Sequence, residues 1–300
     1  MVDFTNCPIN KFKAYGGANG NKINITYNGE SYMLKFPPEA TKNKLMSYAN
    51  SCISEHISCQ ILKSMGFDVQ ETILGTFTNR NGKTHIVVAC KDFTSLDTKL
   101  IEFAELKNAC VDSLNNGYGT EFSNIMAAIE EQELIPVTEM KDYFWRLFIA
   151  DALLGNFDRH NGNWGVLVNE QARIAKLAPV YDCGSCLYPQ ILTTDMEQII
   201  TDDAEIDKRI FVYPTSTIKY EDKKISYFDF ISSHKYEDCS NALVEVAAKI
   251  NMVVIEKIID ETPSITDTQK RFYKTMIKSR KERIIDFSIA KLNQNGAEFS

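Results

Sequence analysis

Residues 155–167 read GNFDRHNGNWGVL and lie between two apolar segments, FIADALL before them and WGVLV at their end. An ordinary surface loop does not gather an aspartate, an arginine and a histidine among glycines and asparagines in this way. Asp158 and Asn163 are five positions apart, and a second short apolar run leads into Asp182 within APVYDCGS. This loop and Asp182 together decide the fold that the sequence predicts.

The spacing of Asp158 and Asn163 suits phosphoryl transfer. That reaction requires positioning, charge neutralisation and an acceptor for the proton of the substrate hydroxyl. A carboxylate at the start of the loop can orient that hydroxyl, and the amide oxygen of Asn163 can bind Mg²⁺, which prefers oxygen ligands. The D-x-x-x-x-N spacing is that of protein-kinase catalytic loops, where a second metal ligand follows the next β segment. Asp182, nineteen residues beyond Asn163, has this place.

Each of these residues also has an ordinary structural explanation. Asp158 could cap a helix, Asn163 could occupy a turn, His160 could be a hydrogen-bonded core histidine, and Asp182 could be a loop carboxylate. Four such residues in kinase order, each in the expected context, favour a kinase-like site over coincidence.

The first third of the chain predicts strands around one helix. Residues 22–36, KINITYNGESYMLKF, alternate polar and apolar residues about an Asn-Gly pair, the strongest short signal of a β-hairpin, and residues 71–90 repeat the device. Between them, residues 47–66 have the periodicity of an amphipathic helix. Before the first hairpin, the glycines of YGGANGNK (residues 15–22) can turn backbone N–H groups toward an anion, although such a turn alone is weak evidence.

Glu55 lies within the apolar stripe of the predicted helix, with Cys52 and Cys59 on the same face. A carboxylate that faces a core is costly unless it is paired. Lys35, at the end of the first hairpin, is its expected partner. Such a pair would satisfy both charges and leave the ammonium of Lys35 aimed at phosphates.

The rest of the chain predicts helices, at residues 97–116, 143–155, 243–260 and 266–292, with two short strands, WGVLV and IAKLAPVY, on either side of the chemistry. Strands followed by helices predict an α+β, bilobal, protein-kinase-like fold with a cleft between the lobes. The N-lobe, an antiparallel sheet plus one helix, is assigned to residues 1–94, and the mainly helical C-lobe to residues 95–300.

Bulk properties limit the other classes of function. The 300 residues carry a net charge of −7, so no overall positive field attracts nucleic acid. No apolar run approaches the roughly 20 residues that span a bilayer, and no signal peptide begins the chain, which predicts a cytoplasmic protein unless it is exported or translocated by another route. The eight cysteines are scattered, and Cys183 with Cys186 has no second ligand pair for zinc.

The runs LLGNFDRHNGNWG, APVYDCGSCLYP, YGGANGNK and YMLKFP together resemble HipA-like kinases over essentially the whole chain. The resemblance implies an ATP- and Mg²⁺-dependent Ser/Thr protein kinase that acts on a protein substrate and autophosphorylates. It gives Asp158 the role of catalytic base, Asn163 and Asp182 that of Mg²⁺ ligands, and Lys35 that of a catalytic, phosphate-binding residue. The remaining residues expected to contact the nucleotide are Gly16, Gly17, Gly20, Lys22, Glu55, Cys90, Lys91, Asp92, Phe93 and His160.

The sequence departs from HipA toxins in two respects. The Gly-rich segment begins at residue 15, so we expect the additional N-terminal subdomain of those toxins to be absent and do not expect an antitoxin partner. HipA autophosphorylates a serine in its nucleotide-binding segment, whereas YGGANGNK contains no serine or threonine. Autophosphorylation would then fall elsewhere, with Ser31, Ser47 and Ser185 as nearby candidates.

Three alternatives remain open at this stage. Phosphoinositide kinases share DRHxxN followed by a metal-binding aspartate, but a lipid kinase needs a basic surface that this acidic chain does not predict. A nucleotide-binding pseudokinase would usually have lost one of Asp158, Asn163 or Asp182. A CxxC redox protein would place its first cysteine at a helix start, whereas YDCGSCLYPQ ends in a proline and a glutamine.

Overall fold

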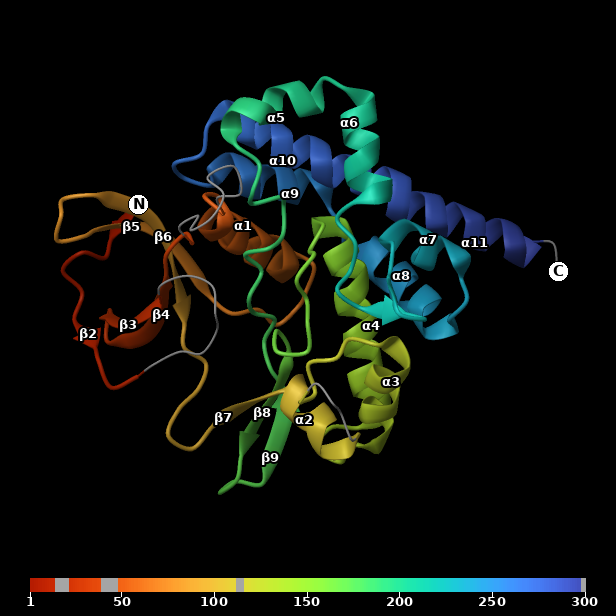
Figure 1. Cartoon of the computed structure of the whole chain (residues 1–300), viewed down its shortest axis with the longest axis horizontal. Helices are drawn as coiled ribbons and strands as arrows, with labels where there is room; N and C mark the ends of the chain where they lie inside the picture. Colours follow the sequence, from red (N-terminus) through yellow and green to blue (C-terminus); the bar gives the residue numbers. More distant parts are fainter. Residues whose placement is uncertain (14–21, 39–47, 112–115, 298–300) are drawn as a thin grey trace. The chain divides into compact units, whose positions relative to one another are not determined.

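The computed structural model describes residues 1–13, 22–38, 48–111 and 116–297, and the chain forms two compact units (Figure 1). The first unit contains residues 1–93 together with residues 180–198 and 253–274. The second contains residues 94–179, 199–252 and 275–300. The chain therefore returns twice to its first unit. The functional lobes assigned from the sequence to residues 1–94 and 95–300 stay a prediction.

A six-stranded sheet forms the centre of the first unit, in the order β1-β5-β6-β4-β3-β2. Both Asn-Gly hairpins predicted from the sequence are present, as β3–β4 and β5–β6. All neighbouring strands are antiparallel except β1 and β5, which pair in parallel at one edge. The strands are β1 (Val2–Asp3), β2 (Ile9–Asn10), β3 (Lys22–Tyr27), β4 (Glu30–Lys35), β5 (Thr72–Thr78) and β6 (Thr84–Lys91).

The alternation of side chains along these strands separates the face that packs into the apolar core from the face that helix α1 covers. On one face, Phe4, Ile25, Leu34 and Ala89 belong to a fully buried apolar cluster. Successive residues of a strand point to opposite faces, so Lys35 at the end of β4 lies on the other side. There, helix α1 (Ser51–Ser64) packs against β5 and β6. The sheet thus directs Lys35 toward the helix that carries Glu55.

Residues 180–198 join the first unit through its backbone. Val180 donates its N–H to the carbonyl of Asp68 at 2.8 Å, and its own carbonyl accepts the N–H of Gln70 at 2.9 Å. Farther along, the side chain of Asn50 donates to the carbonyl of Ile191 at 2.8 Å. These bonds fix the segment that begins two residues before Asp182.

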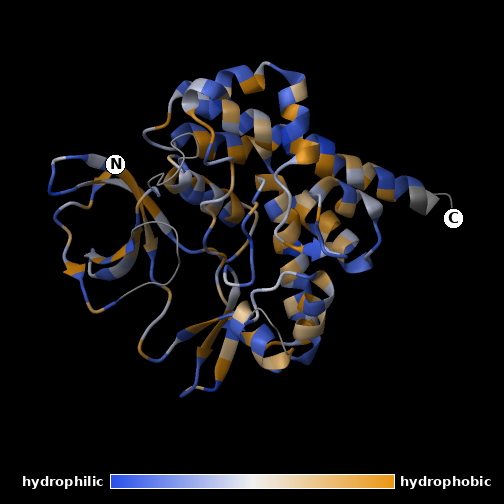
Figure 2. Ribbon diagram, in the orientation of Figure 1, coloured by the Kyte–Doolittle hydropathy of each residue, from blue (hydrophilic) through white to orange (hydrophobic). Residues whose placement is uncertain are grey.

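Helix α4 (Val137–Leu154) is buried over most of its C-terminal half in the second unit, where it packs against α3 (Phe122–Glu131) and α8 (Glu237–Lys249). Phe122 and Trp145 pack their rings against that of Tyr236 at centroid distances of 4.9 and 5.9 Å. Figure 2 shows the corresponding mixture of hydrophobic and hydrophilic residues along these helices. The smaller sheet beside them has the order β7-β8-β9, with β7 (Lys99–Glu102), β8 (Gly165–Asn169) and β9 (Ile174–Leu177).

Two helical predictions need correction. Residues 99–102 were expected to be helical, but they form β7, which pairs antiparallel with β8 through Leu100 and Leu167, and helix α2 (Phe103–Cys110) begins only afterwards. Four residues are too few to distinguish the periodicity of a helix from that of a strand. Pairing with the edge of β8 decides for the strand. The predicted helix at 243–260 is also interrupted, because α8 ends at Lys249 and α9 (Met252–Glu261) begins after a short break.

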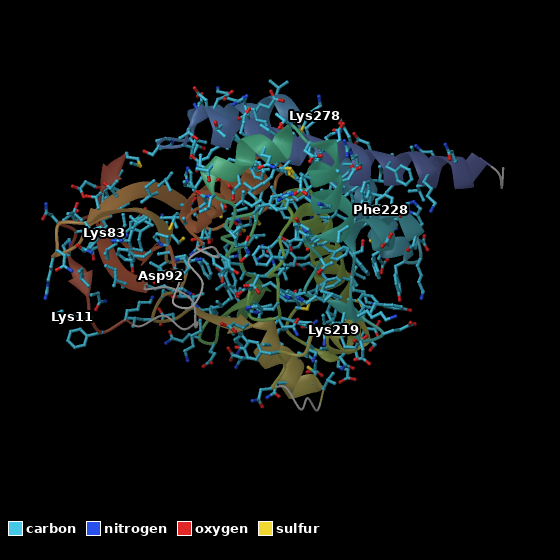
Figure 3. The ribbon with its side chains drawn as sticks, turned by 45° about the horizontal axis from the view of Figure 1, so that its top comes forward. Lys11, Lys83, Asp92, Lys219, Phe228 and Lys278 are labelled. Atoms are coloured by element: carbon cyan, nitrogen blue, oxygen red, sulfur yellow. The ribbon has the colours of Figure 1, made fainter. Side chains whose placement is uncertain are left out.

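The remaining elements complete the chain, and Figure 3 labels Lys219 on β10 and Lys278 on α10. In the part of the chain that the structure describes, no helix is long and apolar enough to cross a membrane. The other elements are α5 (Thr193–Ile200), α6 (Asp203–Asp207), η2 (Lys208–Val212), β10 (Lys219–Tyr220), β11 (Lys223–Lys224), α7 (Tyr227–Ser233), α10 (Asp267–Arg280), η3 (Lys281–Asp286) and α11 (Phe287–Ala297).

Candidate active site

Lys35 and Glu55 form the buried ion pair that the sequence predicts. The Nζ atom of Lys35 lies 2.9 Å from Oε2 of Glu55, and the two residues are only 9% and 1% exposed. The second carboxylate oxygen of Glu55 accepts the backbone N–H of Cys183 at 3.0 Å. Glu55 therefore ties the lysine of β4 to the segment that carries Asp182.

Asp182 adds a second carboxylate to this pair. Its Oδ1 atom lies 3.0 Å from Nζ of Lys35, and its side chain is 40% exposed, in contrast with Glu55. The backbone of Asp182 is left-handed, with φ of 56°, a conformation that aspartate tolerates better than most residues. This contact was not foreseen from the sequence, and it creates a cluster of one ammonium and two carboxylates. We call Lys35, Glu55 and Asp182 the lysine cluster.

The charges of the lysine cluster keep its ammonium protonated. Burial by itself disfavours the charged form, but the carboxylates of Asp182 and Glu55 outweigh it and raise the pKa of Lys35 well above its ordinary value. Burial also raises the pKa of the Glu55 carboxyl, which the positive charge of Lys35 opposes. The cluster thus combines a protonated ammonium with two carboxylates, groups whose chemistry suits phosphate and a metal ion.

The segment of residues 90–93, predicted to contact the nucleotide, lies at the end of β6. Cys90 is fully buried and pairs with Met33 and Thr72 in the sheet. The backbone N–H of Lys91 donates to Glu71 at 2.8 Å, and the N–H of Asp92 donates to Ser31 at 2.9 Å.

Phe93 follows directly and packs its ring against that of Tyr181 at 5.7 Å. Asp92, labelled in Figure 3, forms an ion pair with Lys13. The backbone N–H groups of Lys91 and Asp92 already donate hydrogen bonds within the protein. The backbone N–H of Phe93 is therefore the better candidate to donate a hydrogen bond to a nucleotide base.

The Gly-rich segment is only partly described. Lys22 begins β3 and lies opposite Lys35 in the β3–β4 ladder. Gly16, Gly17 and Gly20 lie outside the described residues, so their expected contacts with nucleotide stay predictions.

In the second unit, helix α4 ends where the loop quoted at the outset begins. Gly155 adopts a left-handed conformation, with φ of 65°, and donates its N–H to the carbonyl of Asp151, which closes the helix. The loop then runs from residue 156 to β8 at Gly165. Glycine suits position 155 because residues with a side chain seldom adopt such a positive φ. The helix end therefore sets where the loop starts.

Asp158 and Asn163 contact each other within this loop. The side-chain nitrogen of Asn163 donates to the backbone carbonyl of Asp158 at 2.7 Å, and the residue is only 5% exposed. This bond uses the amide nitrogen and fixes which atom of Asn163 is its oxygen. Among the described residues, no hydrogen bond reaches that oxygen. The Asp158 carboxylate belongs to a half-buried residue whose N–H donates to the side chain of Asn156 at 3.0 Å.

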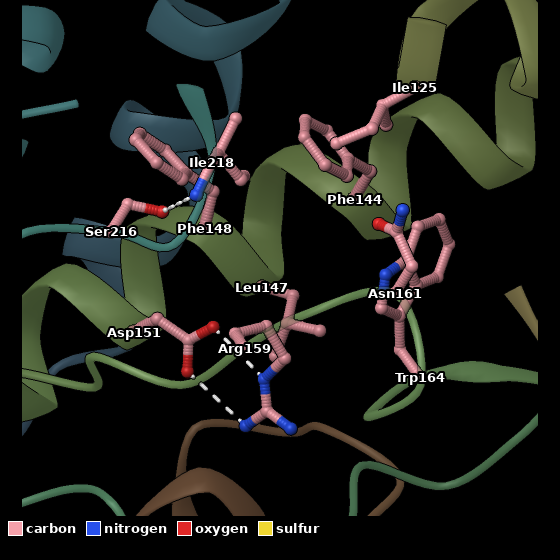
Figure 4. Close-up of a pocket in the computed structure, with 10 residues that line it drawn as sticks. All are labelled: Ile125, Phe144, Leu147, Phe148, Asp151, Arg159, Asn161, Trp164, Ser216 and Ile218. Atoms are coloured by element: carbon pink, nitrogen blue, oxygen red, sulfur yellow. Dashed lines mark hydrogen bonds and ion pairs between the residues drawn. The ribbon is translucent and has the colours of Figure 1, made fainter. Parts of the chain in front are cut away.

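Beneath the loop, Arg159 and Asp151 form a buried ion pair with two hydrogen bonds, at 3.0 Å from Nε and 3.2 Å from Nη2 (Figure 4). The remaining terminal nitrogen, Nη1, donates to the backbone carbonyl of Asn163 at 3.0 Å. Asn156 adds a further bond from its side chain to Asp151 at 2.8 Å. We call Asp151 and Arg159 the loop clamp, since they connect helix α4 to both ends of the loop.

His160 is held in a defined orientation. Its Nδ1 atom accepts the backbone N–H of Gly162 at 3.0 Å, which fixes the orientation of the ring. The backbone of His160 donates to the carbonyl of Asp158 at 2.8 Å. The neighbouring Asn161 is buried, with only 2% of its surface exposed. Figure 4 shows it beside Trp164 at the wall of a small pocket that Arg159 and Phe144 also line.

Sequence reasoning missed the loop clamp, although a signal was present. Asp151 is a carboxylate within the apolar stretch FIADALL, and the rule that predicted a partner for Glu55 applies to it equally. That partner is Arg159 and not Arg146, which is nearer in the sequence but pairs with Asp142 and Glu245. Asn161 gave no comparable signal, because its side chain donates to the carbonyls of Gly117 and Gly119, which are 44 and 42 residues away in the sequence.

Comparison with known proteins places this chain in a family. The sequence matches the HipA-like C-terminal domain family over residues 14–265. The chain belongs to this family. The HipA-like chain is 45% identical, over 286 residues, to the serine/threonine-protein kinase CtkA of Helicobacter pylori, a match that covers 95% of this chain and 86% of that protein.

Solved structures agree with this membership. The crystal structure of the Helicobacter pylori proinflammatory kinase CtkA matches with a TM-score of 0.91 and 44% identity and covers 98% of both chains. HipA of Shewanella oneidensis, solved in a complex with HipB and operator DNA, matches with a TM-score of 0.60 and 15% identity, over 94% of this chain and 67% of that one. The second likeness shows the fold alone. The predicted family and the α+β kinase-like fold are both confirmed.

Proposed function

We propose that the protein is a serine/threonine protein kinase that transfers the γ-phosphoryl group of Mg²⁺-bound ATP to a hydroxyl of a protein substrate. Its likeness to a serine/threonine-protein kinase over almost its whole length supports this class. The observation that carries the proposal is chemical: one chain combines the lysine cluster with a loop that presents a carboxylate and an oriented asparagine oxygen.

In the first unit, Lys35 is the residue proposed to bind phosphate. Its ammonium is protonated and held between two carboxylates at 2.9 and 3.0 Å, so it cannot swing away from the face of the sheet. Glu55 acts as its anchor, because it is buried and also holds the backbone of Cys183. A positive charge fixed in this way stabilises the negative charge of the phosphate chain without reorganisation during the reaction.

Asn163 and Asp182 suit Mg²⁺, each by its own geometry. Magnesium takes oxygen ligands and commonly uses one or two protein side chains together with phosphate oxygens and water. Asn163 has its nitrogen engaged and its carbonyl oxygen left as the ligand atom, and Asp182 presents a half-exposed carboxylate. Mg²⁺, when bound, would neutralise charge on the phosphates.

Asp158 is the proposed base. The substrate oxygen attacks the γ-phosphorus while the bond from that phosphorus to the bridging oxygen of ADP breaks, and ADP leaves with the electron pair. The proton of the substrate hydroxyl passes to the carboxylate of Asp158. His160, whose ring is fixed by Gly162, is proposed to contact the nucleotide.

The alternatives are less well supported. A lipid kinase is not favoured, because the relative that matches 95% of the chain is a serine/threonine-protein kinase and the chain is acidic. A pseudokinase is not favoured, because Asp158, Asn163 and Asp182 are all present. Autophosphorylation remains part of the proposal, with its site unassigned.

The test of the proposal is the variant Asp158→Asn, which keeps the size of the side chain and removes the charge that takes the proton. We expect turnover with a generic protein acceptor to fall on the order of 10²-fold or more, with nearly unchanged ATP affinity. Phosphate transfer is measured with labelled ATP, and affinity by titration of the nucleotide.

Glu139→Gln serves as the matched control, because Glu139 is an exposed carboxylate in the first turn of α4 and the change also removes one negative charge. It should leave both quantities unchanged. Turnover by Asp158→Asn at close to the parental rate would show that this loop does not supply the base.

A further inference from the structure

A group of three side chains lies at the edge of the catalytic loop and has no role in the chemistry above. Tyr118 donates its hydroxyl to Oε2 of Glu102 at 3.0 Å, and its ring lies 6.2 Å from that of His160 in an edge-to-face arrangement. Gly162 sits among them, since a side-chain carbon added there would lie 2.9 Å from Glu102 and 3.0 Å from the Tyr118 ring. Tyr118 is nevertheless 52% exposed.

The catalytic loop itself holds Tyr118 in place. The side-chain nitrogen of Asn161 donates to the carbonyls of Gly117 and Gly119, each at 2.8 Å, and so grips the backbone on both sides of the tyrosine. Gly117 has φ of 78°, and a side-chain carbon there would lie 1.8 Å from the carbonyl oxygen of Ala104. The backbone at Gly117 lies so close to Ala104 that only glycine fits at this position. The exposed ring of Tyr118 is thus held in place before any ligand binds, which is the property of a pre-organised binding surface.

The electrostatics around the ring select a cation. The hydrogen bond to Glu102 and the charge of that carboxylate raise the pKa of Tyr118, and the charge of Glu105 adds to them. Within residues 94–111 and 116–179, no lysine or arginine forms an ion pair with either glutamate. The ring therefore lies beside unneutralised negative charge.

We propose that Glu102 and Tyr118 bind a positively charged side chain, arginine or lysine, of the protein substrate. The face of an exposed tyrosine attracts a cation, and a carboxylate beside it adds a charge-assisted hydrogen bond. The inference rests on the proposed kinase function, and it specifies a substrate class: serine or threonine hydroxyls with a basic residue at a fixed distance along the peptide. Because Asn161 joins this site to the loop that carries Asp158, binding of the basic residue orients the hydroxyl at the base.

The first experiment measures specificity. Serine peptides that carry one arginine or one norleucine, at each position from four before to four after the serine, are compared by kcat/KM. At one position we expect the wild-type protein to prefer arginine about tenfold. Glu102→Gln should reduce that preference below about threefold, and Tyr118→Leu should do the same, whereas Tyr118→Phe, which keeps the ring, should retain much of it.

The KM for ATP distinguishes a role of Glu102 in binding the substrate from a role in binding the nucleotide. It should stay unchanged in Glu102→Gln, and Glu139→Gln should retain the full arginine preference. An arginine preference that is equal in wild type and Glu102→Gln overturns the proposal, as does its absence in an active wild-type protein. A raised ATP KM with an unaltered peptide preference also overturns it, since Glu102 would then serve the nucleotide.

A second measurement does not depend on turnover. Binding of the arginine and norleucine peptides to the Asp158→Asn protein, with ATP and Mg²⁺ present, is followed by fluorescence anisotropy. We expect the arginine peptide to bind about fivefold or more tightly, and addition of Glu102→Gln to remove the difference. If the wild-type protein transfers no phosphate but this difference is present, the kinase function fails while the cation site stands. Equal binding of both peptides rejects the site whatever the activity.

Discussion

The lysine cluster of the first unit and the loop clamp of the second are both buried ion pairs, yet they are built differently. In the clamp, one guanidinium meets one carboxylate, and both residues are at most 7% exposed. In the lysine cluster, one ammonium meets two carboxylates, of which Asp182 is 40% exposed. The clamp is neutral and closed within its own unit, whereas the cluster has excess negative charge and an open side.

From this difference in exposure and charge we expect a structural role for the loop clamp and a ligand-binding role for the lysine cluster. A closed, neutral pair whose third donor reaches a backbone carbonyl holds the shape of a loop. An open cluster with an extra carboxylate still has capacity to bind a ligand, as the proposed roles of Lys35 in phosphate binding and of Asp182 in metal binding require. The predictions below test whether the clamp acts mainly on stability and the cluster mainly on ligand binding.

The largest effect is expected for Asp151→Ala. The change leaves the guanidinium of Arg159 buried without its carboxylate, which costs on the order of 3–5 kcal/mol of unfolding free energy. Both tryptophans of the chain, Trp145 and Trp164, lie in the second unit, so their fluorescence during denaturant unfolding reports on it.

The same helix supplies the control. Asp142 pairs with Arg146 on the surface of α4 at 3.3 Å, and Asp142→Ala should cost less than about 1 kcal/mol. Equal losses in the two variants would mean that the loop clamp contributes no more than a surface pair.

The second prediction concerns Lys35→Met. We expect ATP affinity to fall about 100-fold, or about 2.7 kcal/mol, because the fixed positive charge is lost and two carboxylates face the phosphates. The loss of stability should be smaller than for Asp151→Ala, since the half-exposed Asp182 can remain hydrated. Calorimetric titration of ATP and denaturant unfolding measure the two quantities.

A second substitution sharpens this test. Adding Glu55→Gln removes the unpaired buried charge, so it should recover stability without recovering ATP affinity. Lys83→Met, at an exposed lysine labelled in Figure 3, should alter neither quantity. Parental ATP affinity in Lys35→Met would rule out a phosphate-binding role for the cluster.

The third prediction addresses the metal. ATP at ten times its dissociation constant should stabilise the protein by about 1.4 kcal/mol with Mg²⁺ present, because a ligand that binds only the native state raises stability by mass action. Asp182→Asn should remove most of the difference between Mg²⁺ and chelator, and Asp68→Asn, an exposed site of the same unit, should preserve it. Thermal unfolding measures the effect. An ATP shift that is identical with and without Mg²⁺ in the wild-type protein contradicts the metal assignment.

The smallest effect is a pH dependence in the first unit, on the same helix as Glu55. Burial lowers the pKa of His56, whose Nδ1 lies 2.9 Å from the hydroxyl of Thr72. The folded protein therefore holds the ring neutral while the unfolded chain protonates it near the ordinary value of 6.5. Stability from this group is present above that value and is lost as the pH falls through the lowered pKa.

His56→Gln should flatten this dependence between pH 7 and pH 5 relative to the wild-type protein, with urea unfolding as the measurement. An equally steep loss in both proteins would assign the acid sensitivity to other groups.

The sequence predicted more of the lysine cluster than of the loop clamp. Glu55 in an apolar stripe required a partner, and Lys35 was found correctly. The same argument on Asp151 predicts a buried partner but does not single out Arg159, because Arg146 is nearer in the sequence. The bond from Lys35 to Asp182 was out of reach, because it depends on how a segment 147 residues away returns to the first unit.

The secondary structure shows the same division between local and distant causes. Both hairpins follow from local Asn-Gly signals and were predicted correctly. Residues 99–102 become a strand only because β8 offers an edge, and no local pattern reports this. The return of residues 253–274 to the first unit likewise has no local signature.

The hydrogen bonds of residues 156–164 have a consequence for the timing of catalysis. The backbone N–H groups of Asp158, His160, Gly162 and Asn163 all have acceptors within the loop itself. Such amides exchange with solvent only when the surrounding structure opens, so this irregular segment should be as protected from deuterium as a helix. Its conformational entropy is already lost when the chain folds. If the proposed roles of Asp158 and Asn163 hold, an arriving substrate meets groups that need no ordering, and its binding energy remains available for the transition state.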